Sequence, residues 1–213
     1  ENLGYGSFDP GIQVSPRIAP HLVGQGLLEA IPESQLLEWS DENDLDGDGI
    51  SGVPNYVFDI ESNAEAIGRF GWKANQPTVR QQVASAFVGD IGITSSLFPD
   101  ETCGSDQDEC RENIFIDDIE LTEGIFDRVT VYTATLGVPR RRDWDDSQVL
   151  KGKALFLDIN CNGCHKTKVK TGFYELIPEY SDITIRPYTD LLLHDMGEGL
   201  ADNAPDNRAS GRE

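Results

Sequence analysis

Several residue types are scarce in this chain of 213 residues. It has one methionine, three histidines and four cysteines, and it has no run of eighteen apolar residues, so we expect no membrane-spanning helix. Basic residues are also few, because 17 Lys and Arg stand against 38 Asp and Glu and leave a formal net charge of −21. Such a charge argues against nucleic acid or an anionic membrane surface as a partner and favours cations or basic proteins.

The length allows one large domain or two small ones with a sizeable core. Twenty-one glycines and eleven prolines predict short helices among many turns. The apolar spacing of a helix recurs over residues 22–31, 33–39, 78–88, 120–136 and 147–160. Pro32 separates the first two segments, Pro77 precedes the third, and Pro139 follows the fourth. We therefore predict a mainly α fold with long loops and little β-structure.

The most specific motif is an uninterrupted Cys-x-x-Cys-His at Cys161, Cys164 and His165. Two thiols one turn apart can form thioethers to the vinyl groups of a haem, and the adjoining imidazole then ligates the iron. A structural zinc site would need two more soft ligands, and a thioredoxin-like dithiol has no use for the histidine. The preceding amphipathic segment, with Ser147 as its expected N-cap, would end at the haem. The motif predicts one covalent haem c, with His165 as its proximal ligand.

The two remaining cysteines, Cys103 and Cys110, enclose a short polar loop. A disulfide is their natural pairing, and it requires an oxidising compartment. Thioethers to haem c are also made outside the cytoplasm. Both inferences predict a periplasmic, cell-surface or secreted protein. The chain starts at Glu1 without a signal peptide, so we interpret it as a mature, processed or partial product.

A second motif, Asp-x-Asp-x-Asp-Gly, contains Asp44, Asp46 and Asp48 and is typical of a calcium loop. Alternate carboxylates turn toward one hard cation, and Gly49 permits the sharp turn. Ile50 would contribute its backbone carbonyl to the Ca²⁺ ion, while its side chain anchors the loop.

The twelfth position of this loop is Asn55, where an EF-hand has a bidentate glutamate. Either the calcium affinity is lower, or a different calcium architecture recruits Asp41 or Asn43. The alternative is a solvated turn rich in aspartate and glycine.

Four segments surround the Cys-x-x-Cys-His motif in a characteristic order. They are RIAPHLVGQGLLEAIPE (17–33), DLDGDGISGVPN (44–55), GRFGWKANQPTVRQQVASAFVGDIGITS (68–95) and YTDLLLHDMGEGLAD (188–202). Together they resemble the di-haem oxidoreductase family, also labelled thiol-oxidoreductase-like, which is similar to bacterial di-haem cytochrome c peroxidases. The resemblance implies cytochrome c-like lobes in which one haem accepts electrons and another reduces a small oxidant, with hydrogen peroxide as the first candidate.

Members of that family carry two Cys-x-x-Cys-His motifs, one in each lobe, whereas this chain has one. We therefore interpret the chain as an internal fragment of a longer protein. Residues 1–137 would be the remainder of the first lobe with the calcium loop, residues 138–146 a linker, and residues 147–213 an incomplete second lobe with the haem. A second haem is expected in the parent protein, on an absent segment or another chain.

The iron held by His165 needs a sixth ligand or an open face. Met196 is one candidate, because a thioether ligand would give a high-potential electron-transfer haem, and His194 is the other. Each could instead line the haem or belong to the core, since the distal ligand of the peroxidases comes later in the chain. His21 is expected to be structural.

The resemblance also implies that Trp72 lies on the electron path between the two haems, although an ordinary buried tryptophan is an equal alternative. Arg69 and Lys73 flank it and could pair with haem propionates. The basic cluster at 140–142 could meet propionates or a partner, but an interdomain salt-bridge network is the favoured interpretation.

Three functions are compatible with these features. The leading one is an exported haem c protein for electron transfer, within a peroxidase-like di-haem oxidoreductase that meets a basic redox partner. The second is a non-catalytic electron carrier or structural multihaem module. The third is a calcium-dependent binding module with a vestigial haem site.

Overall fold

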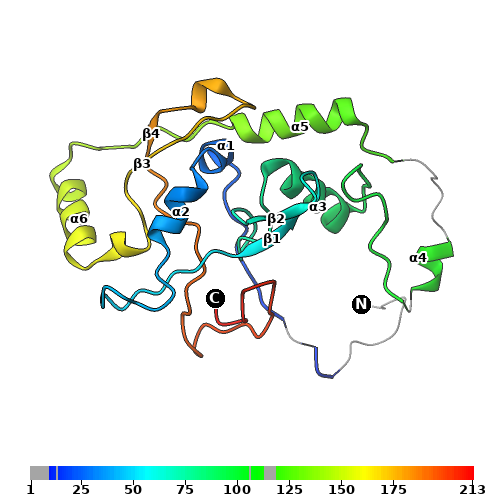
Figure 1. The fold of residues 1–213 in the computed structure, drawn as a ribbon, viewed down its shortest axis with the longest axis horizontal. Coiled ribbons are helices and arrows are strands. Elements are labelled where there is room, and N and C mark those ends of the chain that lie inside the picture. Colours follow the sequence, from blue (N-terminus) through cyan, green and yellow to red (C-terminus); the bar gives the residue numbers. More distant parts are fainter. Residues whose placement is uncertain (1–9, 13, 106, 113–118) are drawn as a thin grey trace.

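The computed structural model describes residues 10–12, 14–105, 107–112 and 119–213 (Figure 1). Within these ranges the α-helices are α1 (Gln25–Glu29), α2 (Glu33–Trp39), α3 (Val79–Ile91), α4 (Asp108–Glu112), α5 (Glu123–Thr135) and α6 (Ser147–Asp158). Two 3₁₀ turns are η1 (Cys161–Gly163) and η2 (Pro178–Tyr180). Two antiparallel hairpins pair β1 (Tyr56–Asp59) with β2 (Ala64–Ile67) and β3 (Val169–Lys170) with β4 (Thr184–Ile185). The predicted mainly α fold with little β-structure is confirmed.

The five predicted helices all form, and side chains cap the N-termini of two of them, α3 and α6. The segment 22–31 shortens to α1, because Gly24 takes a left-handed conformation with φ of 80° at the N-cap. Thr78 caps α3 by accepting a hydrogen bond from the backbone N–H of Gln81. No helix among the described residues is long and apolar enough to cross a bilayer.

The expected N-cap of α6 was wrong by one residue. Asp146, in an extended conformation, caps the helix, and its carboxylate accepts from the backbone N–H groups of Gln148 and Val149 at 2.7 and 3.3 Å. An aspartate caps as well as a serine, and here it comes first in the chain, so Ser147 becomes the first helical residue.

Two apolar clusters form the core. The first packs α3 against α5 and consists of Phe70, Val79, Val83, Ala84, Leu121, Phe126 and Ala134. The second surrounds α2 and the β3–β4 hairpin and consists of Ile31, Leu36, Ile67, Val169 and Ile185. The second cluster therefore joins residues from both sides of segment 138–146, which contains no helix or strand.

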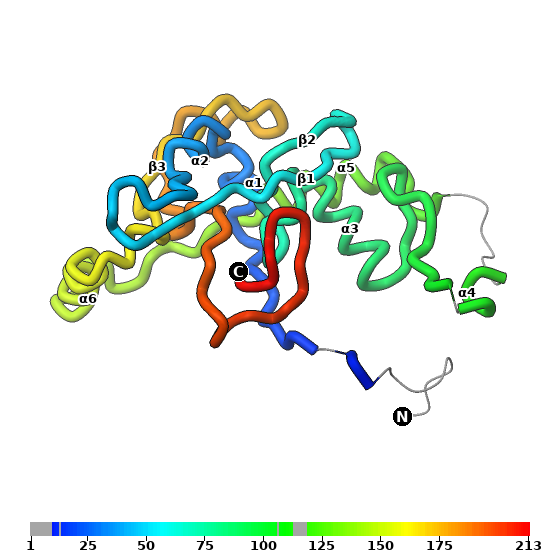
Figure 2. The backbone as a smooth tube through the Cα atoms, turned by 60° about the horizontal axis from the view of Figure 1, so that its bottom comes forward, coloured from blue at the N-terminus to red at the C-terminus, as the bar shows by residue number. Residues whose placement is uncertain are grey.

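Helix α6 stands apart from this core, at one edge of the molecule in both views (Figures 1 and 2). None of its residues is buried. Leu150, Leu155 and Leu157 are about half exposed, at 50%, 59% and 46%. The apolar residues that predicted an amphipathic helix are thus only partly covered by the described residues.

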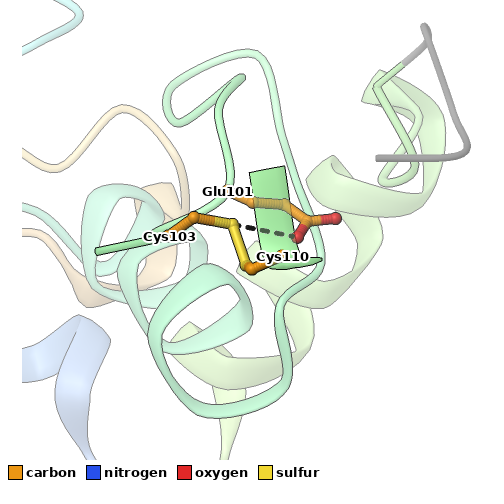
Figure 3. A group of neighbouring side chains, drawn as sticks. All are labelled: Glu101, Cys103 and Cys110. Atoms are coloured by element: carbon orange, nitrogen blue, oxygen red, sulfur yellow. Dashed lines mark hydrogen bonds between the residues drawn. A yellow bond between two sulfur atoms is a disulfide. The ribbon is translucent and has the colours of Figure 1, made fainter. Parts of the chain in front are cut away.

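The predicted disulfide between Cys103 and Cys110 is present, with its Cα atoms 5.8 Å apart (Figure 3). Cys110 lies on α4, and the Glu101 carboxylate approaches the Cys103 sulfur to 4.0 Å. Because both sulfurs are used in the disulfide, this group of side chains has no thiolate left for a metal ion.

Candidate functional site

The Cys-x-x-Cys-His segment follows directly from the end of α6. Asn160 takes a left-handed conformation with φ of 59°, which asparagine tolerates, and turns the chain into η1. The His165 N–H then donates to the Cys161 carbonyl at 2.9 Å. The turn places the two cysteines close together, and both thiols are free and partly buried.

Among the described residues, a backbone carbonyl forms the hydrogen bond that holds the His165 imidazole. Its Nδ1 lies 2.9 Å from the carbonyl oxygen of Tyr188. A carbonyl oxygen can only accept, so we assign the proton to Nδ1, which leaves Nε2 with the lone pair that binds a metal. The Phe156 ring lies 6.1 Å from the imidazole and 5.8 Å from the Tyr188 ring, centroid to centroid. The sequence did not point to Tyr188 because the contact uses its backbone.

The loop after the aspartate motif packs against this turn. The Ile50 side chain lies in the space that a Cβ atom on Gly163 would occupy. The side chains of Leu192 and His194 likewise lie in the space that a Cβ atom on Gly52 would occupy. The Ile50 side chain therefore packs against the Cys-x-x-Cys-His turn.

Three chemically active groups meet beside the motif. Cys164 Sγ lies 3.8 Å from His194 Nδ1, and His194 Nε2 lies 2.9 Å from Asp190 Oδ2. Asp190 is buried, at 4% exposure. Burial raises the pKa of the Cys164 thiol, and the nearby Asp190 carboxylate adds to the effect. The sequence indicated His194 as a candidate but not Asp190, although Asp190 precedes it by four residues in the chain.

The aspartate loop brings three carboxylates together, those of Asp41, Asp44 and Asp46, with ligand oxygens within 4.8 Å of one another. Asp41 Oδ2 accepts from the backbone N–H groups of Leu45 and Asp46 at 2.8 and 3.3 Å. Asp48 lies outside this group and accepts from the Ile50 N–H at 2.8 Å. Asp41, which the sequence offered as an alternative ligand, thus lies nearer to the other two carboxylates than Asp48 does.

Asn55 is turned away from the aspartates and is fully buried, at 0% exposure. Its Nδ2 donates to the carbonyl oxygens of Lys73 and Asp206 at 2.8 and 3.4 Å, and its Oδ1 accepts from the Arg208 N–H at 2.9 Å. Both ends of the amide therefore hold the fold together, and the structure does not bring this side chain to the aspartate group.

Trp72 lies on the surface, at 54% exposure, with the Arg17 guanidinium 5.5 Å from its ring. The alternative of an ordinary buried tryptophan is therefore wrong. Lys73, beside it, is buried, and its Nζ donates to the Asp202 carboxylate at 2.9 Å and to the Ala204 carbonyl at 2.6 Å. The Lys73 ammonium is therefore already paired with Asp202 and Ala204 of the same chain.

Arg69 is also engaged within the protein. Its guanidinium donates to the carbonyl oxygens of Leu28 and Ile31 at 3.2 and 2.7 Å, next to the end of α1. Burial lowers its pKa, because the charged form loses its water. The Arg69 guanidinium is therefore already paired with backbone carbonyls inside the protein.

Two further candidates, Met196 and His21, have exposed side chains. The Met196 N–H donates to the Arg212 carbonyl at 3.1 Å, while its side chain is 59% exposed. The three arginines at 140–142 are exposed and form no ion pair with any described residue.

An open groove of about 590 Å³ runs along α6. Apolar side chains line it together with three cationic ones, and these residues include Val149, Phe156, Leu157, Arg141, Lys153, Arg186 and Tyr188. Phe156 and Tyr188 connect the groove to His165. The apolar face of residues 147–160 was the one signal of this groove in the sequence.

Comparison with known proteins adds one match. A family model described as "Di-haem oxidoreductase, putative peroxidase" matches residues 2–213. No curated protein and no solved structure matches the chain significantly.

Proposed function

Because the chain belongs to the di-haem oxidoreductase family, we propose that it is an exported haem c protein that transfers electrons within a peroxidase-like enzyme. One observation carries this proposal: two free thiols stand in one turn beside an imidazole whose Nδ1 is tied to the Tyr188 carbonyl. A bound haem c would supply an iron that exchanges single electrons with a redox partner or with peroxide.

The residues of the turn fit this cofactor. Cys161 and Cys164 offer the two sulfurs that thioether bonds require, and His165 offers Nε2 with its lone pair. The leucines of α6, each about half exposed, provide accessible apolar surface beside the turn. A porphyrin is a large apolar plane, so the donor set and the open apolar surface both support the assignment.

Each residue of the turn would have a separate task. Cys161 and Cys164 would hold the macrocycle covalently, and His165 would ligate its iron. The Tyr188 carbonyl keeps the Nδ1 proton in place and fixes the plane of the imidazole, which raises the basicity of Nε2. The exposed Met196 thioether is our candidate for the sixth ligand, since His194 would have to give up one of two contacts to reach the iron.

We keep Trp72 as the candidate for electron transfer between this haem and a second one in the parent protein. Its exposed ring supports the proposal, because an indole that reaches the surface can approach a cofactor carried by another segment or chain. The division into a first lobe (1–137), a linker (138–146) and a second lobe (147–213) is part of the same proposal. Each lobe would be cytochrome c-like.

Calcium binding is a second part of the proposal. Asp41, Asp44 and Asp46 supply oxygens close enough to share one cation, and Asp48 and the Ile50 carbonyl could complete the set. A bound Ca²⁺ would fix the loop whose Ile50 packs against the haem turn. Adding Ca²⁺ to chelator-treated protein should raise the melting temperature, and an Asp44→Asn, Asp46→Asn double variant should lose that response. An unchanged melting temperature with no metal in elemental analysis would refute calcium binding.

The compartment and partners follow from chemistry already described. A disulfide and haem thioethers both require maturation outside the cytoplasm, in the periplasm, at the cell surface or after secretion. The net charge of −21 supports a basic redox protein as electron donor. Hydrogen peroxide is the proposed oxidant, because the family is described as a peroxidase. A non-catalytic electron carrier is the second candidate, favoured by the presence of one haem motif in 213 residues.

The chain should be matured in an oxidising compartment together with a haem-attachment system, and then examined by intact mass and a pyridine haemochrome spectrum. One covalent haem is expected, and it should be absent from a Cys161→Ser, Cys164→Ser double variant. A mass equal to that of the bare polypeptide would overturn the haem proposal. Peroxide-dependent oxidation of the reduced protein would favour the enzyme, and a low-spin spectrum unmoved by peroxide in both redox states would favour the carrier.

A further inference from the structure

The Cys164 thiol has a defined hydrogen-bond partner. Its Sγ lies 3.8 Å from His194 Nδ1, within the range of a hydrogen bond to sulfur. For the other thiol of the motif, that of Cys161, no such contact is found among the described residues. The two cysteines that would receive the haem vinyl groups are therefore held differently before attachment.

The neighbouring carboxylate determines which group donates in the hydrogen bond between Cys164 and His194. Asp190 Oδ2 lies 2.9 Å from His194 Nε2, and an ionised carboxylate can only accept. In the neutral imidazole of His194 the proton therefore sits on Nε2, and Nδ1 presents a lone pair to Cys164. In this tautomer the thiol donates and the imidazole accepts.

The imidazole has little freedom to leave this position. Asp190 is buried at 4% exposure, and its Oδ1 accepts from the Leu192 N–H at 3.1 Å. Gly52 packs closely against the ring of His194, and Val53 and Leu193 exchange two backbone hydrogen bonds at 3.0 and 2.8 Å. The ring is thus fixed from the carboxylate side and from the loop that precedes β1.

We infer that His194, held by Asp190, is a positioning residue that aims the Cys164 sulfur for thioether formation with the haem. The inference rests on the proposed function. In the attachment step the S–H of Cys164 adds across a vinyl double bond: the new S–C bond forms at one vinyl carbon, the hydrogen ends on the other, and the vinyl π bond is lost. Thiol and vinyl together neither gain nor lose electrons. A fixed sulfur is also kept from pairing with Cys161 in a competing disulfide.

Three variants separate this role from others: His194→Leu, which cannot accept a hydrogen bond, His194→Asn, whose amide can, and His21→Leu as a control on an exposed histidine. Each chain is matured with a haem-attachment system, and mass spectrometry of the proteolytic haem peptide counts the thioethers at each cysteine. His194→Leu is expected to lower thioether formation at Cys164 about fivefold, the size of one net hydrogen bond, and to leave Cys161 nearly unchanged. His194→Asn should restore most of the loss, and His21→Leu should have no effect.

Two results would overturn the inference. Equal losses at both cysteines would show a merely structural role. Intact thioethers with a changed axial-ligand spectrum would make His194 an iron ligand. A second measurement does not depend on haem: in ¹H–¹⁵N spectra of the haem-free full chain, His194 should carry its proton on Nε2, and Cys164→Ala should move the Nδ1 resonance. A proton on Nδ1 would contradict the inference, whereas a chain that never takes up haem but shows the expected tautomer would contradict only the proposed function.

Discussion

The Ile50 side chain lies against Gly163, in the space where any larger residue at position 163 would begin its side chain. This contact joins the aspartate loop to the Cys-x-x-Cys-His turn. The two segments are distant in sequence, and Gly52 adds a second contact to His194 from the same loop. We therefore expect a change in the position of this loop to be felt at the turn through these two contacts.

The first prediction concerns this contact. Gly163→Ala is expected to lower the free energy of unfolding by about 1 kcal/mol, because the new methyl group displaces the flexible end of the Ile50 side chain into another rotamer. The yield of covalent haem should fall as well. Urea unfolding gives the free energy, and the haemochrome spectrum gives the yield.

Gly152 of α6 is a matched control, because a Cβ atom there meets no other atom within 4 Å. Gly152→Ala should leave the stability unchanged or raise it by up to about 1 kcal/mol, since alanine favours the helix. Adding Ile50→Ala to Gly163→Ala should recover part of the loss. Fully additive losses in the double variant would contradict a direct contact.

The second prediction tests whether the Asn55 side chain stabilises the fold or binds calcium. Its amide serves the carbonyl of Lys73 and the N–H of Arg208 in a fully buried position. Asn55→Ala should cost roughly 2 to 4 kcal/mol of unfolding free energy, because buried polar groups lose their partners. Urea unfolding should give the same loss in Ca²⁺ and in chelator. A loss seen in Ca²⁺ alone would instead identify Asn55 as a ligand.

The third prediction concerns the disulfide, which closes a loop between residues separated by 7 in sequence. A Cys103→Ser, Cys110→Ser double variant should lose about 2 to 3 kcal/mol of unfolding free energy, since its unfolded state gains chain entropy. Denaturant melts with and without a reductant provide the measurement. The reductant should destabilise the natural chain by a similar amount and leave the variant unaffected, whereas a response of the variant would implicate Cys161 and Cys164.

Much of the helical framework could be predicted because its signals are local. The apolar spacing and a preceding proline define α2 within the residues predicted, 33–39. The β1–β2 hairpin gave no such signal, since its strands do not alternate cleanly between apolar and polar residues. The Gln81 side chain of α3 holds it, accepting from the Ile60 N–H and donating to the Phe58 carbonyl. A hairpin secured by a distant helix cannot be recognised from its own residues.

The candidate site divides in the same way. Adjacent residues of one turn were visible as a motif, and the structure keeps them in that turn. Asp190 and Ile50 join them only through tertiary packing, which no spacing in the sequence encodes. Asn55 shows the opposite error: its place twelve residues into a loop resembled that of a ligand, but distant backbone groups use its side chain.

The last prediction concerns Glu29, whose carboxylate is largely buried between the start of α3 and the segment that contains Tyr174. Its Oε2 accepts from the Val79 N–H at 3.1 Å and from the Tyr174 hydroxyl at 3.2 Å. Burial raises the pKa of Glu29 above its ordinary value, and these two hydrogen bonds lower it in part. Removing one donor, as in Tyr174→Phe, should therefore raise this pKa further.

A carboxyl whose pKa is raised in the folded state contributes stability that is fully present below its pKa in the unfolded chain. That contribution is lost as the pH rises through the folded value. Glu29→Gln stays neutral with a similar shape, so the free energy of unfolding of this variant should gain on the natural chain as the pH rises through that window and level off above it. Urea unfolding of both chains across the acid range measures the difference. Tyr174→Phe in the natural background should steepen the pH dependence of the free energy of unfolding. A difference between Glu29→Gln and the natural chain that stays constant or falls with pH would show that the pKa of Glu29 is not raised in the folded state. Only a carboxylate destabilised by folding makes the neutral amide variant progressively more stable than the natural chain as the pH rises.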